Sequence, residues 1–359
     1  MKEIIRFELK KLINRRKTII TCIVLVALCI GSFILIQATI GDAKGAAEKL
    51  TQYEGSMDDN PIFVEAEQKH KEIYENYVAK NKKMSASVEQ QWQNLEYPMW
   101  LLNCNEIRKT RLAEIGFHAD SLIVGDTIFY AFFEEFMATY CPFILGFLIV
   151  LLISPIFAQE YDQKMYGLVL STKHGKKRII IGKLLATIII IILACVYTII
   201  LFGLIDFCMW GPGILDASFV LAGDNVFIYL FAPYNFRVWM YLLVQFGCLL
   251  LGSLGLGFFV FYVSSKCRNS LLTALISLTI LCVPIMLFNL LGENEGLIPN
   301  VLRCSYSLIM GGRHLFSGYY PLYEASTITM PVVSFVLLCI GSIMFIFGGF
   351  RNFRVFYKE

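Results

Sequence analysis

The sequence predicts an all-α integral membrane protein with six transmembrane helices. Apolar residues make up 57% of the 359 residues, and the mean hydropathy of +0.63 exceeds that of ordinary soluble domains. Several apolar runs are longer than the ~18 residues that a spanning helix needs. Charged residues are also divided unequally between alternate connecting segments, as expected of a multi-pass membrane protein.

Six apolar runs are assigned as spans, and the polar segments between them alternate between the two sides of the membrane. The predicted spans are 18–40, 128–158 (which starts with an interfacial segment), 184–205, 238–263, 271–291 and 330–350. The inside segments are 1–17, 159–183, 264–270 and 351–359, and the outside segments are 41–127, 206–237 and 292–329.

The distribution of basic residues indicates the orientation. The inside segments hold 18 Lys or Arg residues and five acids, whereas the outside segments hold 13 Lys or Arg residues and 21 acids. Basic residues are retained on the cytoplasmic side of a membrane. We therefore expect both termini to be cytoplasmic and the chain to lie in a bacterial plasma membrane.

Residues 1–17 are predicted to form a basic amphipathic helix at the inner membrane surface. Ile5, Leu9, Leu12 and Ile13 recur at the spacing of one helical face. The alternative is the charged start of a signal peptide. The apolar run that follows, 18–39, is longer than the 7–15 residues of a signal-peptide core, which favours a retained first span.

The polar insertion 41–127 is predicted to be a helical hairpin or a small helical domain outside the membrane. Asn60 followed by Pro61 is typical of a helix start, and Ser87–Gln90 has the spacing of a capping box. Helices are expected over 62–80 and 89–115, with a turn at 80–84. The insertion serves either as a spacer or in substrate capture and release, and the sequence leaves both open.

Glu134 and Glu135 lie among aromatic residues just before the second span. We expect an interfacial helix that presents the two acids to the outer headgroups. The alternative is a buried acid pair that binds a cationic substrate. Adjacent acids also occur in membrane proteases of the Glu-Glu-x-x-x-Arg type, but Thr139 and Tyr140 stand where the arginine is needed.

The later spans carry packing features but no charged groups. Ser253 and Gly257 have the small-xxx-small spacing that lets helix backbones approach closely. In the outside segment that follows the fifth span, short membrane-facing helices are expected over 297–323. The last span is followed by the basic residues Arg351, Arg354 and Lys358.

The sequence lacks the motifs of common catalytic and metal sites. There is no G-x-x-x-x-G-K-[ST] phosphate-binding loop, and no H-E-x-x-H motif links any of the four His residues. The 11 Cys residues include no CxxC pair, so a structural zinc site is not predicted. Whether any of Cys104, Cys208 and Cys304, which lie outside or near the outer surface, form a disulfide is left open.

The inside segment 159–183 is the most structured of the connecting segments. It holds six Lys or Arg residues and two acids, and it divides into a short helix at 160–170, a turn at 171–175 and a run into the third span. A basic loop that only sets the orientation is the simplest interpretation. Its ordered residues are Glu160, Gly167, Leu170-Ser171-Thr172, Gly175-Lys176 and Gly182-Lys183-Leu184-Leu185.

This order of residues resembles the coupling loop of type 2 ATP-binding-cassette permeases, and the six spans resemble that family over nearly the whole chain. The family's common Pro after the Leu-Leu-Ser step is replaced by Thr172-Lys173. The resemblance implies a loop helix that docks on a separate ATPase. The implied coupling residues are Glu160, Met165, Gly167, Leu168, Val169, Leu170, Ser171 and Thr172.

The resemblance also implies the partners and the reaction. This chain would bind no cofactor, while ATP and Mg would bind to a separate cytoplasmic ATP-binding-cassette ATPase. A second permease subunit, identical or different, and membrane lipid are the other expected partners, and nucleic acid is not. The implied function is export of an amphiphilic substrate such as a peptide, toxin or lipid-like molecule. The alternatives are a membrane-embedded protease or acyltransferase and a ligand sensor.

Overall fold

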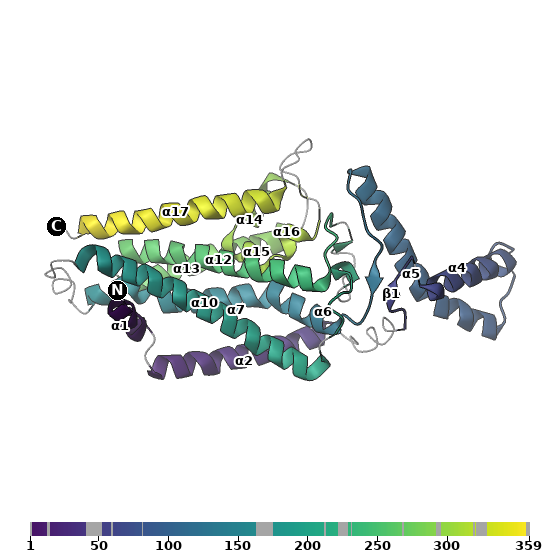
Figure 1. Ribbon diagram of the computed structural model, residues 1–359, viewed down its shortest axis with the longest axis horizontal. Coiled ribbons are helices and arrows are strands. Elements are labelled where there is room, and N and C mark those ends of the chain that lie inside the picture. The colour runs from purple at the N-terminus through teal and green to yellow at the C-terminus, as the bar shows by residue number, and fades with distance from the viewer. Residues whose placement is uncertain are drawn as a thin grey trace.

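The computed structural model shows an elongated helical bundle with a helical hairpin at one end (Figure 1). Among the residues that it describes, six helical stretches are long and apolar enough to cross a membrane. The described residues are 2–12, 15–40, 52–58, 60–80, 82–162, 175–211, 213–221, 229–230, 232–267, 269–291, 296–318, 320 and 329–356.

The candidate spans follow the predicted order. The first, fourth, fifth and sixth are single helices, the second is built from four consecutive helical segments, and the third is the longest helix of the bundle. Their bounds are α2 Arg15–Ile40, then α6 Ile128–Glu135, η2 Phe136–Tyr140, α7 Cys141–Ile153 and α8 Pro155–Asp162, then α10 Gly175–Trp210, α12 Val238–Lys266, α13 Ser270–Leu291 and α17 Met330–Phe356.

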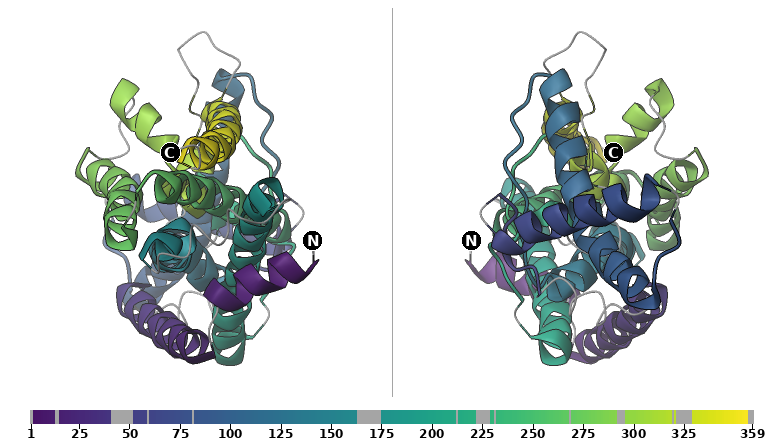
Figure 2. Two further views of the ribbon diagram at one scale, coloured as in Figure 1. Left: turned by 90° about the vertical axis from the view of Figure 1, so that its left-hand side faces the viewer. Right: turned by 90° about the vertical axis from the view of Figure 1, so that its right-hand side faces the viewer.

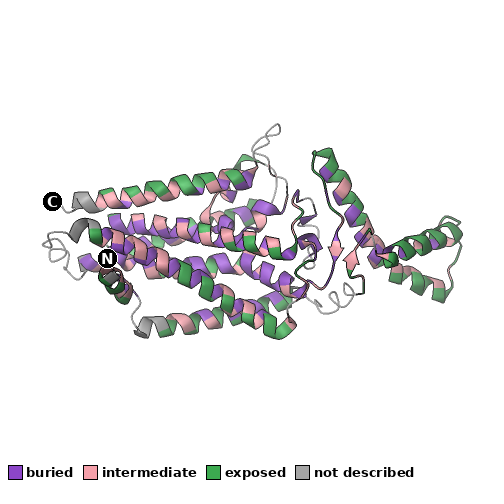
Figure 3. Ribbon diagram, in the orientation of Figure 1, coloured by how far each residue is buried: buried purple, intermediate pink, exposed green. Residues whose placement is uncertain are grey.

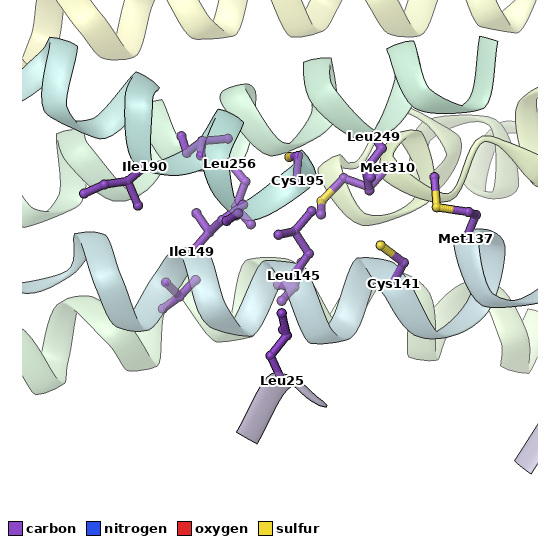
Figure 4. Packing of buried hydrophobic residues seen from close by; sticks show 14 of the residues in the cluster. Leu25, Met137, Cys141, Leu145, Ile149, Ile190, Cys195, Leu249, Leu256 and Met310 are labelled. Carbon is purple, nitrogen blue, oxygen red and sulfur yellow. The ribbon is translucent and has the colours of Figure 1, made fainter. Parts of the chain in front are cut away.

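Helix α12 lies at the centre of the bundle, where it packs against α7, α10, α13 and α17. Aliphatic side chains from these helices interdigitate around it, including Leu145 and Ile149 of α7 and Leu249 and Leu256 of α12 (Figure 4). The outward faces of α2, α13 and α17 are instead exposed and apolar (Figure 3). A helix with apolar residues on its outward face is suited to contact with lipid.

A short helix that was predicted to face the membrane is buried in the bundle. The segment after α13 forms α14 Leu297–Arg303, α15 Tyr306–Gly311 and α16 Arg313–Phe316. Leu297 is 82% exposed, as expected, but α15 is buried against α7 and α12. Gly252 permits this contact, because a Cβ there would lie 3.0 Å from the backbone nitrogen of Met310.

The predicted helical hairpin is present in the insertion. Its arms are α4 Pro61–Ile73, extended by the π-helical turn η1 Tyr74–Val78, and α5 Ala86–Glu114. The Asn60 side chain caps α4 by accepting a hydrogen bond from the Ile62 amide at 3.0 Å. The capping box at Ser87 is wrong, because the extended backbone of Ser85 makes that residue the N-cap and Ser87 lies inside α5.

The base of the insertion is part of a second hydrophobic core. The two-residue strands β1 Gly55–Ser56 and β2 Ile123–Val124 pair antiparallel and bring the start and end of the insertion together. Phe63 and Leu101 from the hairpin pack in one cluster with Phe219 of the 3₁₀ turn η3 Phe219–Leu221 and with Phe316. Only the far part of the hairpin stands away from the bundle (Figure 1).

Polar and charged side chains also tie the insertion to the bundle end. The buried guanidinium of Arg108 donates to the Asp120 carbonyl at 3.0 Å and to the Asn235 side chain at 2.8 Å. Burial of this cation lowers the pKa of Arg108. All 11 cysteines, including Cys104, Cys208 and Cys304, are free thiols, so the structure contains no disulfide between them.

Several helices extend beyond their predicted ends. Helix α10 runs from Gly175 to Trp210, beyond the predicted 184–205, and α17 runs to Phe356, beyond the predicted 350. Lys183 and Asp206, near the two ends of α10, are both buried, so a limit drawn at the first charge is too short. Helix α1 Lys2–Leu12 is correspondingly shorter than 1–17, since α2 begins at Arg15.

Candidate functional site

The predicted coupling loop joins α8 to α10 at the end of the bundle near α1 (Figure 1). Of the predicted coupling residues, Glu160 is described by the structure, and it is buried on α8. The others, Met165, Gly167, Leu168, Val169, Leu170, Ser171 and Thr172, lie outside the described residues. The described site therefore consists of the two ends of this loop and the helix beside them.

Four charged side chains meet at these loop ends, and we name them the loop-base cluster: Glu8, Lys11, Glu160 and Lys183. The Lys183 side chain is fully buried, and its Nζ lies 2.6 Å from Glu160 Oε1 and 3.3 Å from Glu8 Oε2. Lys11 Nζ lies 2.9 Å from the same Glu160 oxygen. The cluster therefore links α1 to both helices that flank the loop.

Two further contacts complete the environment of Lys183. Its Nζ donates to the carbonyl of Ile156 at 2.7 Å and lies 5.2 Å from the centre of the Phe157 ring. The ammonium thus has two carboxylates, a carbonyl and an aromatic face around it, which offset the loss of water on burial. These contacts fix the side chain of Lys183 in one position.

The local sequence explains why α1 lies against α10 at this point. Leu12 is buried and Leu9 packs against the main core, so the apolar face of α1 turns toward the bundle. Gly182 allows the close approach, because a Cβ there would lie 2.6 Å from Ile4 Cγ2. The Gly182-Lys183 pair thus supplies both the space for α1 and the cation that its Glu8 requires.

The cluster balances two cations against two carboxylates. For Lys11, burial and then the nearby Lys183 charge lower the pKa, while Glu160 opposes them. Removing one member of such a buried set leaves its partner uncompensated, which costs about 3–5 kcal/mol. The loop-base cluster contains no activated nucleophile. Its ion pairs hold the two loop ends and α1 together as one mechanical unit.

The predicted acid pair Glu134 and Glu135 lies at the opposite end of the bundle, next to the insertion. Glu134 is 5% exposed, so the expectation that it faces the headgroups is wrong. Arg313 of α16 binds both acids, with its Nε 2.9 Å from Glu134 Oε1 and its Nη2 2.5 Å from Glu135 Oε2. Tyr229 donates a further hydrogen bond to Glu134. Arg313 thus compensates a pair that the sequence showed without a nearby cation.

Sequence reasoning missed several of these charged positions. Glu8 lies three residues after Ile5 and directly before Leu9, on the apolar face of α1. An acid on such a face indicates that a buried cation pairs with it. Lys183 belongs to the loop motif, which by itself does not indicate that its side chain is buried. Arg313 is separated from Glu134 by 179 residues, and no spacing rule connects the two.

The described part of the chain also offers no metal site, since it contains no group of three or more His, Cys, Asp or Glu residues that could hold a metal ion. The described residues therefore lack the ligand set of a hydrolytic metal centre. The described residues form a bundle of candidate membrane spans with a helical hairpin at one end and, at the other, a loop whose two ends are joined by ion pairs.

A comparison with protein families gives the class of the chain. Residues 3–316 match the family described as "ABC-2 family transporter protein". The match includes the first five spans, the insertion and the loop 159–183, so the chain belongs to this family of transport proteins. No curated protein matches the sequence.

Proposed function

We propose that this chain is the transmembrane subunit of an ATP-driven exporter and that loop 159–183 receives motion from a separate ATP-binding-cassette ATPase. Family membership supports the class of transport subunit. The loop-base cluster supports the coupling, because it connects both ends of the loop to one another and to α1.

Transmission of force needs a rigid element that moves as a body. If a partner pushed on a loop with free ends, the loop would bend and the spans would stay in place. Here α8 belongs to the second span and α10 is the third span, and Lys183 pairs with Glu160 across their ends. Displacement of the loop would therefore tilt both spans together.

The remaining components of the proposal follow from the family resemblance and the charge distribution. ATP and Mg bind to the ATPase, a second permease subunit completes the pathway, and the loop side of the bundle faces the cytoplasm of a bacterium. The exported substrate is amphiphilic, such as a peptide, toxin or lipid-like molecule. Resistance to an antimicrobial peptide is one process that such an exporter would serve.

The Lys183→Met variant tests the proposal. Met keeps much of the side-chain volume but removes the ammonium, so two carboxylates share only Lys11, and the free energy of unfolding should fall by about 3–5 kcal/mol. In liposomes that contain the chain with its ATPase, ATP hydrolysis should no longer drive transport. Lys10→Met, at an exposed position of α1, is the matched control and should change neither measurement.

A double variant separates coupling from folding. Lys183→Met with Glu160→Leu removes a cation and an anion together, and apolar replacement of a buried pair is often neutral for stability. Thermal stability should recover while transport stays low. Normal transport by a stable double variant would show that the cluster serves only the fold. The chain purified alone should hydrolyse no ATP, and hydrolysis by the isolated chain would contradict the proposal.

A further inference from the structure

Four acidic side chains are buried in the described part of the chain, and three of them pair with a cation of the chain itself. Glu8, Glu134 and Glu160 each have a carboxylate oxygen within 3.3 Å of a lysine or arginine nitrogen. The fourth, Asp206 of α10, is 0% exposed, and neither of its carboxylate oxygens has a hydrogen-bond partner among the described residues. This carboxylate therefore lacks the positive group that the other three buried acids possess.

Asp206 lies on a face of α10 that is lined by aromatic rings. Phe202 and Trp210 lie one helical turn before and after it, and residues four apart share a helical face. The ring centre of Trp210 lies 5.2 Å from that of Phe132 in α6, and the ring centre of Phe202 lies 6.2 Å from that of Phe33 in α2. Helices α2, α6 and α10 therefore meet at this face, with Asp206 between the two rings that α10 contributes.

The position of Asp206 along α10 places it near one membrane surface. Trp210 is the last residue of α10, four residues or about 6 Å beyond Asp206, at the end of the bundle next to the insertion (Figure 1). Lys183 of the loop-base cluster lies 23 residues before Asp206 in the same helix, about 35 Å away. Helix α10 therefore carries a compensated cation at its loop end and an uncompensated acid near its other end.

The chemistry of these groups decides which cation fits them. The carboxylate oxygens accept hydrogen bonds, so the missing partner is a cation that carries N–H groups. The indole N–H of Trp210 makes no hydrogen bond among the described residues, so it does not supply the missing donor. A metal ion fits poorly, because the described residues contain no group of three or more His, Cys, Asp or Glu residues that could hold one. Aromatic faces attract cations, so an ammonium group satisfies both the oxygens and the rings.

We propose that Asp206 binds the ammonium group of an amphiphilic substrate, with aromatic rings of α6 and α10 beside it. The inference rests on the proposed export function and narrows its substrate to cationic amphiphiles, such as a long-chain amine or a lysine-containing peptide. The acid pair Glu134 and Glu135 does not take this role, because Arg313 already pairs with both. Because Asp206 is enclosed, the ammonium enters when α2 separates from α6 and α10, and the pairing then offsets the cost of the buried charge.

Equilibrium binding of dodecylammonium to the purified chain tests the site. The unaltered chain in dodecyl maltoside is titrated with radiolabelled dodecylammonium, and in parallel with radiolabelled 1-dodecanol, which has the same chain length but no charge. Dodecylammonium should bind saturably, with one molecule per protomer, and dodecanol should not. A carboxyl group that is protonated and binds nothing would give no saturable binding of either compound, which would overturn the proposal.

Two acid variants show whether the charge of Asp206 is responsible. Asp206→Asn keeps the shape of the side chain and should weaken dodecylammonium binding by about tenfold or more, as expected for loss of a charged hydrogen-bond acceptor. It should also fold, since Asp206 has no partner to lose, and thermal unfolding checks this. Asp216→Asn, which removes the same charge from an exposed acid beyond the end of α10, should leave binding unchanged. Unchanged binding by Asp206→Asn would contradict the site.

A pair of ring variants tests the aromatic part of the site. Trp210→Leu removes one ring beside Asp206 and should weaken dodecylammonium binding by about twofold to fivefold, the range expected for a single cation–ring contact. Phe207→Leu is the matched control, since Phe207 is 51% exposed and lies next to Asp206 in sequence but not on its face of α10. An equal loss in both variants would show that dodecylammonium binds the apolar outside of the helix, which would contradict the site.

Export by the complete complex separates this inference from the proposed function. In liposomes that contain the chain with its ATPase, export of dodecylammonium at concentrations below its dissociation constant should fall in Asp206→Asn by the same factor as its affinity. Unchanged export by Asp206→Asn would refute the site and leave the exporter standing. Saturable binding to the chain without ATP-driven export would refute the exporter and leave the ammonium site standing.

Discussion

At the scale of single residues, two of the buried ionisable side chains on α10, Lys183 and Asp206, have opposite surroundings. Lys183 is surrounded by two carboxylates and a carbonyl. Asp206 is also fully buried, yet among the described residues neither of its carboxylate oxygens has a hydrogen-bond partner. An ionisable group inside a membrane bundle is expensive and commonly functional. The first residue stabilises the fold, and the second is expected to destabilise it.

Replacing Asp206 should therefore raise stability. Asp206→Leu removes a buried polar group that has no partner, which should increase the free energy of unfolding by about 1–3 kcal/mol, measured by thermal unfolding in detergent. Asp216→Leu is the control, since Asp216 is exposed and its contact with Arg237 lies at the surface, where it contributes little. A lower stability of Asp206→Leu would show that this carboxyl has a stabilising partner.

At the scale of elements, the six spans were predictable because a long apolar run can be recognised from its length alone. The positions at which the spans end were not predictable in this way. Prediction stopped α10 at 184 and 205 because Lys183 and Asp206 appeared too polar for a span, yet both are buried. One of the two carboxylates that compensate Lys183 is Glu8, 175 residues away, and hydropathy carries no information about such a partner.

The same reasoning explains what was predictable about the site. Glu160 was predicted as a coupling residue at the start of the loop, and in the structure Lys11 and Lys183 both pair with it. The helix α15 was assigned to the membrane surface because its apolar residues suit either lipid or a protein interior. Its packing against α7 and α12, including the close contact of Gly252 with Met310, distinguishes the two locations, and such contacts depend on the three-dimensional fold.

The loop helix predicted at 160–170 is tested by changes to its expected docking face. Leu168→Asp places a charge on the apolar side, and Gly167→Trp adds bulk where the ATPase would approach closely. Each should weaken copurification with the ATPase or uncouple hydrolysis from transport, since buried anchors in such interfaces contribute about 1–3 kcal/mol each. Lys176→Gln is the control. A double variant with normal binding and transport would refute the docking helix.

The hairpin of the insertion can be tested without disturbing its base. Replacing residues 69–94 with a short Gly-Ser turn removes the far part of the hairpin but keeps Phe63, Leu101 and Arg108, which are buried at the bundle end. The shortened chain should insert and support ATP hydrolysis with its partner, while export falls. Unchanged export would make the hairpin a spacer, and loss of the folded bundle would show that its outer part is structural.

At the scale of the whole molecule, the loop-base cluster and the insertion lie at opposite ends of the bundle (Figure 1). The end-on views place α1 across one end of the spans and the hairpin helices across the other (Figure 2). In the proposed orientation, the end with the basic helix α1 faces the cytoplasm, as the charge rule predicts. The hairpin would then face outward.

Cysteine labelling tests this orientation. On a cysteine-free background, a single Cys at Glu67 or Lys82 should react with a membrane-impermeant thiol reagent in intact cells. A Cys at Lys176 or Lys358 should react only after the membrane is permeabilised. Labelling is measured by gel shift, with total reactivity in detergent as the control. Reaction at position 176 in intact cells would reverse the orientation and with it the proposed ATPase side.

The pairing of Glu8 with Lys183 also has a consequence for biosynthesis. At 5–20 residues per second, a ribosome needs roughly 10–35 s to translate the 175 residues between them. During that interval the newly made α1 lacks both its partner cation, Lys183, and the surface at Gly182 against which it packs. Its basic residues can hold it at the membrane surface in the meantime. Helix α1 can therefore complete its docking only after the third span, which carries Lys183, has been made.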